Sequence, residues 1–134
     1  MCFVNFFFVK FFFVFFGGEY LSMVLCFSRD LFELVVNGLV SCSVCFEDLG
    51  FVVGDVVVLE FVDDGFLGEC GDECVCSLVA CIKDVCVFRF GFLDDVVAFK
   101  LGFRSSVLLR RYLRLLFPDL GSDVLCFVYE FEVV

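Results

Sequence analysis

The stretch Val56-Val57-Val58-Leu59-Glu60-Phe61-Val62 decides the fold class, because β-branched and aromatic residues dominate it. Gly54-Asp55, directly before it, is a turn signal, and Cys74–Ala80 is a second run of the same kind. The segment between the two runs, residues 63–72, is rich in glycine and acidic residues and predicts a loop. The two runs therefore predict an antiparallel hairpin on which the rest of the chain packs.

Upstream of this hairpin, apolar residues in 20–37 recur at intervals of three and four, which predicts a helix. Residues 40–46 and 51–53 predict short strands. Residues 82–90 fit either a helix or an extended segment.

Downstream, Ser105 or Ser106 can cap a helix whose apolar stripe includes Leu109 and Leu113, and Pro118 stops it. Residues 123–134 alternate in character and predict a strand. The whole order predicts an α+β fold, a small mixed sheet with two or three packed helices.

The amino terminus differs from the rest of the chain. Residues 1–18 form an apolar arm and residues 19–134 a single α+β domain in this interpretation. Within the arm, residues 3–16 are almost all Phe and Val, interrupted by Lys10. Three alternatives follow: contact with a membrane, a buried strand, or an arm that packs against partner subunits.

Composition excludes several classes of protein. The 134 residues are 63% hydrophobic, which excludes intrinsic disorder. The net charge of −10 argues against a nucleic-acid partner. His, Thr and Gln are absent and Pro118 is the one proline, and all four residue types need cytosine in their first two codon positions. This pattern is similar to mitochondrial messages that undergo uridine-insertion RNA editing, and it predicts a mitochondrial protein.

Motifs that would carry chemistry are weak. Without His, a Ser-His or Cys-His nucleophile is impossible, so no catalytic residue is expected. Cys42 and Cys45 have the spacing of half a zinc site that Cys70 and Cys74 could complete, but the second spacing is wrong. We therefore expect no metal, no cofactor and mostly buried, inert thiols among the ten cysteines.

Basic residues concentrate on the helix that ends at Pro118. Either this cluster is a solvated helix face or it is an electropositive edge that docks the carboxylates of a partner. Acid pairs, by contrast, are typical of solvated loops, although Mg²⁺ binding by one of them is an alternative. The predicted interface residues are Arg104, Arg110, Arg111, Arg114, Asp94 and Asp95.

The same region resembles a known family. Residues 92–103 are similar to the W-Y-E-R-E-[IV]-x-D-x-F-G-[VI] signature of NADH dehydrogenase subunit 9, the 30-kilodalton subunit of respiratory complex I. Residues 109–113 resemble its L-R-R-I-L, and residues 117–121 its F-P-L-x-G. The likeness covers residues 45–134, although the tryptophans and the His-Pro-Asp of the family are missing.

The resemblance implies a non-catalytic core subunit of the peripheral, quinone-module arm of mitochondrial NADH:ubiquinone oxidoreductase, on the matrix side of the inner membrane. Such a subunit would bind other subunits of the respiratory chain complex, especially the quinone-site subunit, and support electron transport from NADH to ubiquinone. Two alternatives stay open: a small membrane subunit of a respiratory complex, and a mitochondrial ribosomal protein.

Overall fold

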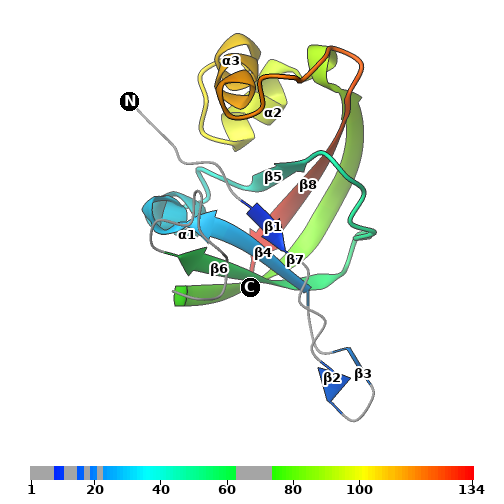
Figure 1. Ribbon diagram of the computed structural model, residues 1–134. Coiled ribbons are helices and arrows are strands. Elements are labelled where there is room, and N and C mark those ends of the chain that lie inside the picture. The colour runs from blue at the N-terminus through cyan, green and yellow to red at the C-terminus, as the bar shows by residue number, and fades with distance from the viewer. Residues whose placement is uncertain (1–7, 11–14, 17–18, 21–22, 63–73) are drawn as a thin grey trace.

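The computed structural model describes residues 8–10, 15–16, 19–20, 23–62 and 74–134 (Figure 1). Six strands form one mixed sheet in the order β1-β4-β6-β7-β8-β5. They are β1 (Phe8–Lys10), β4 (Met23–Ser28), β5 (Cys42–Cys45), β6 (Val56–Val62), β7 (Cys74–Arg89) and β8 (Leu125–Val133). β2 (Phe15–Phe16) and β3 (Glu19–Tyr20) pair separately. The helical segments are η1 (Arg29–Leu31), α1 (Phe32–Val36), η2 (Phe90–Phe92), α2 (Asp95–Lys100) and α3 (Ser106–Leu116). The predicted α+β class is confirmed.

The long strand β7 organises the sheet by pairing with two neighbours in succession. Its first half pairs antiparallel with β6, from Val62 opposite Cys74 to Val56 opposite Cys81. Its second half pairs antiparallel with β8, and the register shifts between Ile82 and Asp84. The predicted hairpin is therefore confirmed. The ambiguous segment 82–90 is extended up to Arg89 and then enters η2.

The helix predicted over residues 20–37 is wrong for its first half. Residues 23–28 form β4, which lies parallel to β6 with Leu25 opposite Leu59. Val24, Leu25 and Phe27 are all buried there, and consecutive buried residues suit a strand covered on both faces better than a helix with one apolar stripe. Helical structure begins at Arg29, where the Ser28 hydroxyl accepts a hydrogen bond from the Asp30 N–H.

Other local predictions had mixed outcomes. The strand predicted over 40–46 is confirmed as β5, but residues 51–53 form no strand and lead into the turn at Gly54. Gly54 has a φ of +97°, a conformation that glycine adopts without strain. The Gly54 N–H donates to the Ile82 carbonyl, so this turn is fixed to β7. The loop predicted over 63–72 lies outside the described residues.

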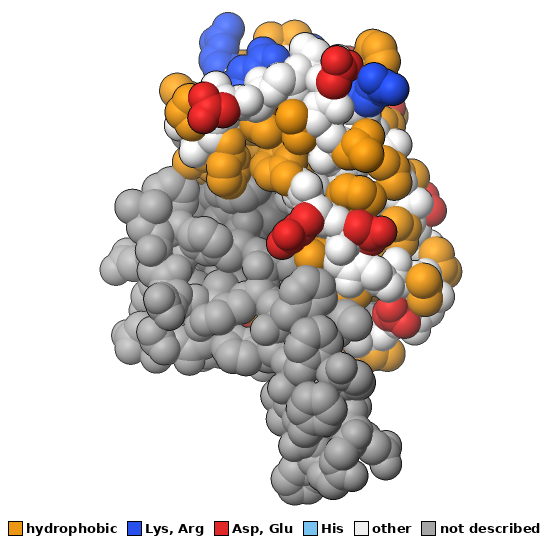
Figure 2. All heavy atoms as spheres, turned by 45° about the vertical axis from the view of Figure 1, so that its right-hand side comes forward, with side chains coloured by type: hydrophobic (Ala, Val, Ile, Leu, Met, Phe, Trp, Pro, Cys, Tyr) orange, Lys and Arg blue, Asp and Glu red, His pale blue; other side chains and the backbone are white. Residues whose placement is uncertain are grey.

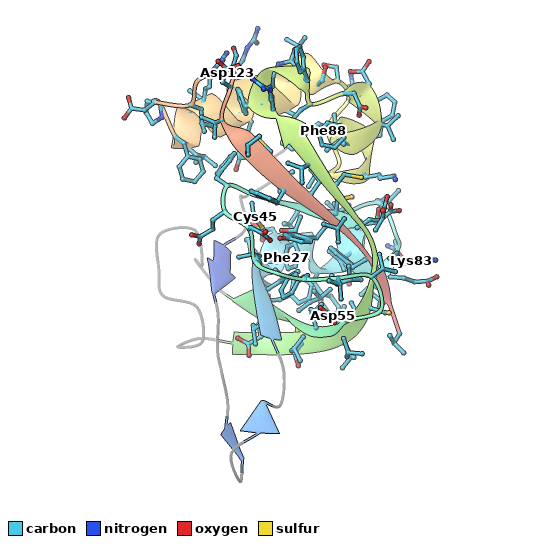
Figure 3. All side chains as sticks on the ribbon, turned by 90° about the vertical axis from the view of Figure 1, so that its right-hand side faces the viewer. Phe27, Cys45, Asp55, Lys83, Phe88 and Asp123 are labelled. Carbon is cyan, nitrogen blue, oxygen red and sulfur yellow. The ribbon has the colours of Figure 1, made fainter. Side chains whose placement is uncertain are left out.

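The hydrophobic core lies between the six-stranded sheet and the segments that connect its strands. Phe27 on β4 stacks on Phe61 of β6, with ring centroids 5.5 Å apart, and Phe131 of β8 meets Phe27 edge-on at 5.9 Å. Tyr129 is fully buried on the same strand. Figure 3 shows Phe27 and Cys45 among the side chains that fill this interior, whereas Lys83 projects away from it.

Helices α2 and α3 cover one end of the sheet, next to the ends of β7 and β8 that lie farthest from α1 (Figure 1). α2 ends in a Schellman motif: Gly102 has a φ of +90°, its N–H donates to the Phe99 carbonyl, and the Phe103 N–H donates to the Ala98 carbonyl. The reversal places α3 beside α2. Leu109 and Leu113, the predicted apolar stripe, are buried beneath α3, and Ser105 is its N-cap.

No helix in the described part of the chain has the length and apolar character that a membrane crossing requires. Of the predicted amino-terminal arm, only 8–10 and 15–16 are described, as β1 and β2. The boundary predicted at residue 18 lies outside the described residues, so the division into arm and domain stays a prediction.

Candidate functional site

The predicted interface residues divide into two groups in the structure, those that hold α2 and α3 together and those that face outward. Asp94 is the N-cap of α2, because its Oδ1 accepts a hydrogen bond from the Val97 N–H at 2.9 Å. Asp95 Oδ1 accepts the Ser106 N–H at 2.7 Å and so links the start of α2 to the start of α3. Both acids thus have structural partners within the helical end.

The hydrogen bonds from Ser106 hold the pKa of the Asp95 carboxyl below its usual value. A lowered pKa keeps this carboxylate ionised as the acceptor that positions α3. The two acidic residues that sequence analysis placed at an interface therefore help to fix the arginine-bearing helix in place.

Arg110 and Arg114 are anchored to backbone carbonyls. Arg110 Nη1 donates to the Leu93 carbonyl at 2.7 Å, and Arg114 Nε donates to the Leu120 carbonyl at 3.3 Å. The Arg114 guanidinium also lies over the ring of Phe90, 4.9 Å from its centroid. These contacts fix the direction of two flexible side chains. The Asp95 carboxylate also interacts with the positive charge of Arg110, which contributes to the lowered pKa of Asp95.

Arg104 and Arg111 are exposed, and among the described residues no ion pair joins either of them to an acid. Arg111 lies between Arg110 and Arg114 on α3. Figure 2 shows Lys and Arg side chains at the end of the molecule that carries the helices, with acidic side chains both beside them and lower on the visible face. Arg104, Arg110, Arg111 and Arg114 are four of the nine basic residues of a protein with a net charge of −10.

A shallow groove of about 440 Å³ runs along the outer face of α3. Among the described residues it is lined by Val107, Arg110, Arg111, Arg114 and Leu115. These five residues, which we call the α3 stripe, follow the spacing i, i+3, i+4, i+7, i+8 and therefore form one continuous helix face. The apolar ends are solvent-accessible: Val107 is 55% exposed and Leu115 76% exposed.

A second charged cluster, which sequence analysis missed, joins α2 to the sheet. Lys100 Nζ lies 3.0 Å from Glu130 Oε1 on β8, and this hydrogen bond raises the pKa of Lys100. The Ser41 N–H donates to the Lys100 carbonyl, so α2 also contacts the start of β5. In the sequence, Glu130 is visible only as a charged residue that alternates with apolar neighbours on the strand. Its partner Lys100 is 30 positions away, and only the fold brings the two side chains together.

The cysteine pair Cys42 and Cys45 is buried in β5. Residues three apart on a strand point to opposite faces, so the two thiols cannot bind one metal ion together. Burial raises the pKa of each thiol to about 12, which disfavours the thiolate that metals and electrophiles require. Across the described residues no group of three potential ligands is placed to hold a metal. Cys70 lies outside them.

Comparison with known proteins gives a likeness in fold. No protein-family model and no curated protein matches the chain. Protein EF3133 from Enterococcus faecalis V583, described as DUF984, has a TM-score of 0.58 at 16% identity, covering 78% of this chain and 67% of its own. An ASCH domain from Lactobacillus crispatus JV V101 gives 0.57 at 17% identity, with 75% and 68% covered. Hypothetical protein PH0355 gives 0.58 at 14% identity, with 81% and 95% covered.

The assignment to the 30-kilodalton subunit of complex I is wrong, because the similar structures are DUF984 and ASCH-domain proteins. The predicted role as a subunit of NADH:ubiquinone oxidoreductase falls with it. The alternatives, a membrane subunit and a mitochondrial ribosomal protein, find no support in these structures either. The matrix-side location stays a prediction.

The sequence motifs that suggested that family have local structural explanations. Asp94 caps a helix, Leu109 and Leu113 are the buried side of an amphipathic helix, and Pro118 follows the helix end. Many unrelated helices need a capping acid, apolar residues four apart and a terminating proline. In a chain built from few residue types, these requirements account for the matching helix motifs.

Proposed function

We propose that this protein is a binding module whose α3 stripe holds the carboxylates of a protein partner. The observation that carries the proposal is that Arg110 and Arg114 are fixed by backbone carbonyls on both sides of an exposed Arg111. Guanidinium groups held in this way lose little further freedom on binding, which favours affinity. The ASCH-like fold supports a small module but does not identify its partner.

The remaining donors of the two anchored arginines suit carboxylates. Arg110 uses Nη1 on Leu93, which leaves Nε and Nη2 as one pair of donors. Arg114 uses Nε on Leu120, which leaves Nη1 and Nη2 as another pair. Each pair has the geometry of a bidentate contact with a carboxylate, the strongest common form of this ion pair.

An acidic protein segment fits this surface better than a nucleic acid. Affinity for nucleic acid is gained from many phosphate contacts along an extended basic track. Here three arginines occupy one helix face of a chain with a net charge of −10. Val107 and Leu115 add apolar contact area at both ends of the arginines, and a mixture of arginine and apolar groups is characteristic of protein interfaces.

Titration with an acidic peptide, followed by fluorescence anisotropy, tests the proposal. Arg111→Gln should weaken binding by about three- to tenfold, since an exposed charged contact contributes up to about 1 kcal/mol or somewhat more. The matched control is Lys83→Gln, which removes one positive charge at a distance from the helices (Figure 3). Equal effects of both substitutions would mean a response to net charge alone and would refute the site.

A single-stranded RNA of the same charge is the second ligand in this experiment. We expect RNA to bind more weakly than the peptide at 150 mM salt. Tighter RNA binding that depends on Arg111 would identify a nucleic-acid partner and overturn the proposal.

A further inference from the structure

The arrangement of residues on the α3 stripe also restricts the conformation of the partner segment. We infer that the segment bound there is an acidic amphipathic α-helix that lies along α3, an inference that rests on the proposed function. Val107 and Leu115 are eight residues apart, so the stripe extends for about 12 Å, or two helical turns. The charged groups occupy the middle and the apolar groups the ends.

Backbone hydrogen bonding favours a helix over an extended segment. The surface offered by the stripe is the side of a helix, where the backbone N–H and C=O groups already bond within α3. An extended peptide would lose water from its own backbone groups here and gain no backbone partner. A helix satisfies its backbone internally, so it can approach this face with its side chains alone.

Spacing on the stripe determines spacing on the partner. Arg110 and Arg114 are four residues apart, one turn of helix, and their free donor pairs require two carboxylates at a similar separation. Glu residues four apart on one helix face meet this requirement. An apolar residue about one turn before the first Glu would cover Val107, and an apolar residue directly after the second Glu would cover Leu115, because Leu115 directly follows Arg114. The expected partner motif therefore repeats the spacing of the stripe, apolar-x-x-Glu-x-x-x-Glu-apolar, with a variation of one position at either end.

The helix is held well enough to act as a fixed platform. Ser105 caps it, Asp95 accepts the Ser106 N–H, and Leu109 and Leu113 anchor its inner face. Arg110 and Arg114 add bonds to the segments before and after it. Because these contacts are on other faces of α3 or on single guanidinium nitrogens, they leave the stripe open.

Three synthetic 16-residue peptides test this inference with the full-length protein. The first carries the expected motif in an alanine-rich helix. The second has the same composition, but its two Glu are placed two residues apart, so that they point to different sides of a helix. The third is the first with a central Ala→Pro substitution that breaks the helix. We expect the first to bind at least tenfold more tightly than the other two, and its helical circular dichroism to increase on binding.

Two protein variants separate this inference from the function on which it rests. Leu115→Ser, at a highly exposed position, should weaken binding of the first peptide at least threefold without affecting the fold. Arg111→Gln should weaken binding of any peptide that uses the arginines. Equal affinity for all three peptides, with Arg111 still required, would overturn the helical partner and leave the proposed function intact. Failure of all three to bind, or indifference to Arg111→Gln, would overturn the proposed function itself.

Discussion

Replacing Tyr129 by Phe removes one hydroxyl from the centre of the protein and should be clearly destabilising. The Tyr129 side chain is fully buried, and its hydroxyl accepts a hydrogen bond from the Leu49 N–H at 2.9 Å. The aromatic ring itself meets Phe51 edge-on, with centroids 5.1 Å apart. Phe keeps this ring contact but leaves the buried Leu49 N–H without a partner.

The expected loss follows from that orphaned donor. A buried polar group left unsatisfied costs about 1–3 kcal/mol of unfolding free energy. For a chain of this length, each kcal/mol lowers the midpoint of thermal unfolding by about 3–6 °C. Urea denaturation should therefore show a lower midpoint for Tyr129→Phe with an unchanged m-value, because the surface exposed on unfolding is the same.

Hydrogen exchange of the backbone amides shows where Tyr129→Phe loosens the structure. The Leu49 N–H should exchange faster in Tyr129→Phe than in the parent protein, while amides in β7 far from the substitution lose protection only in proportion to global stability. Asp55→Ala is the comparison, because Asp55 Oδ2 accepts the Val52 N–H in the neighbouring turn. Asp48 is unsuitable for this purpose, since the Tyr129 hydroxyl donates to its Oδ1. Unchanged stability together with unchanged protection of Leu49 would refute the proposed role of this hydroxyl.

Two further predictions concern pH. Burial raises the pKa of three thiols from 9.0, to about 12 for Cys42 and Cys45 and about 11 for Cys126, so the unfolded chain ionises first. The protonated thiols stabilise the folded protein fully below pH 9, and this stabilisation should decline as the pH rises toward 11. Urea denaturation at pH 7.5 and pH 10 measures the change in unfolding free energy. Equal stability at the two pH values would contradict the prediction. The lowered pKa of Asp95 makes stability depend on pH in the opposite direction. Its hydrogen bond with Ser106 stabilises the folded protein above pH 4, and this stabilisation is lost as the pH falls through the folded-state pKa. Asp95→Ala should lower the melting temperature at pH 6, and the difference in melting temperature between variant and parent should be smaller at pH 3. The same difference at both pH values would count against this contact.

Local patterns in the sequence predicted much of the fold. The run 56–62, the capped helix after Ser105 and the alternating strand before the carboxyl terminus are all observed. Each depends on neighbouring residues only: β-branched content, a capping hydroxyl, or alternation along one strand.

Predictions that depended on tertiary context failed. Residues 23–28 have apolar positions that fit a helix, yet β4 pairs with β6 because both faces of that segment are covered. The contact between Lys100 and Glu130 depends on how the α2 end meets β8, which no local pattern records. The family resemblance failed for the converse reason, since its motifs were local requirements shared by many helices.

The arrangement of charge on α3 is difficult to explain by stability alone. Arg110 and Arg114 are like charges at i and i+4, which disfavour a helix by about 0.2–0.5 kcal/mol. Arg111 adds a third positive charge between them, in a chain with only nine basic residues. The structure offsets the repulsion with carbonyl bonds from Leu93 and Leu120, and so preserves the positive face. Arg114 lies in the last turn of α3, where a positive charge interacts favourably with the helix dipole. Arg110 and Arg111 lie before that turn and gain less from it, so we propose that their charge serves binding, which makes the α3 stripe the first place to test.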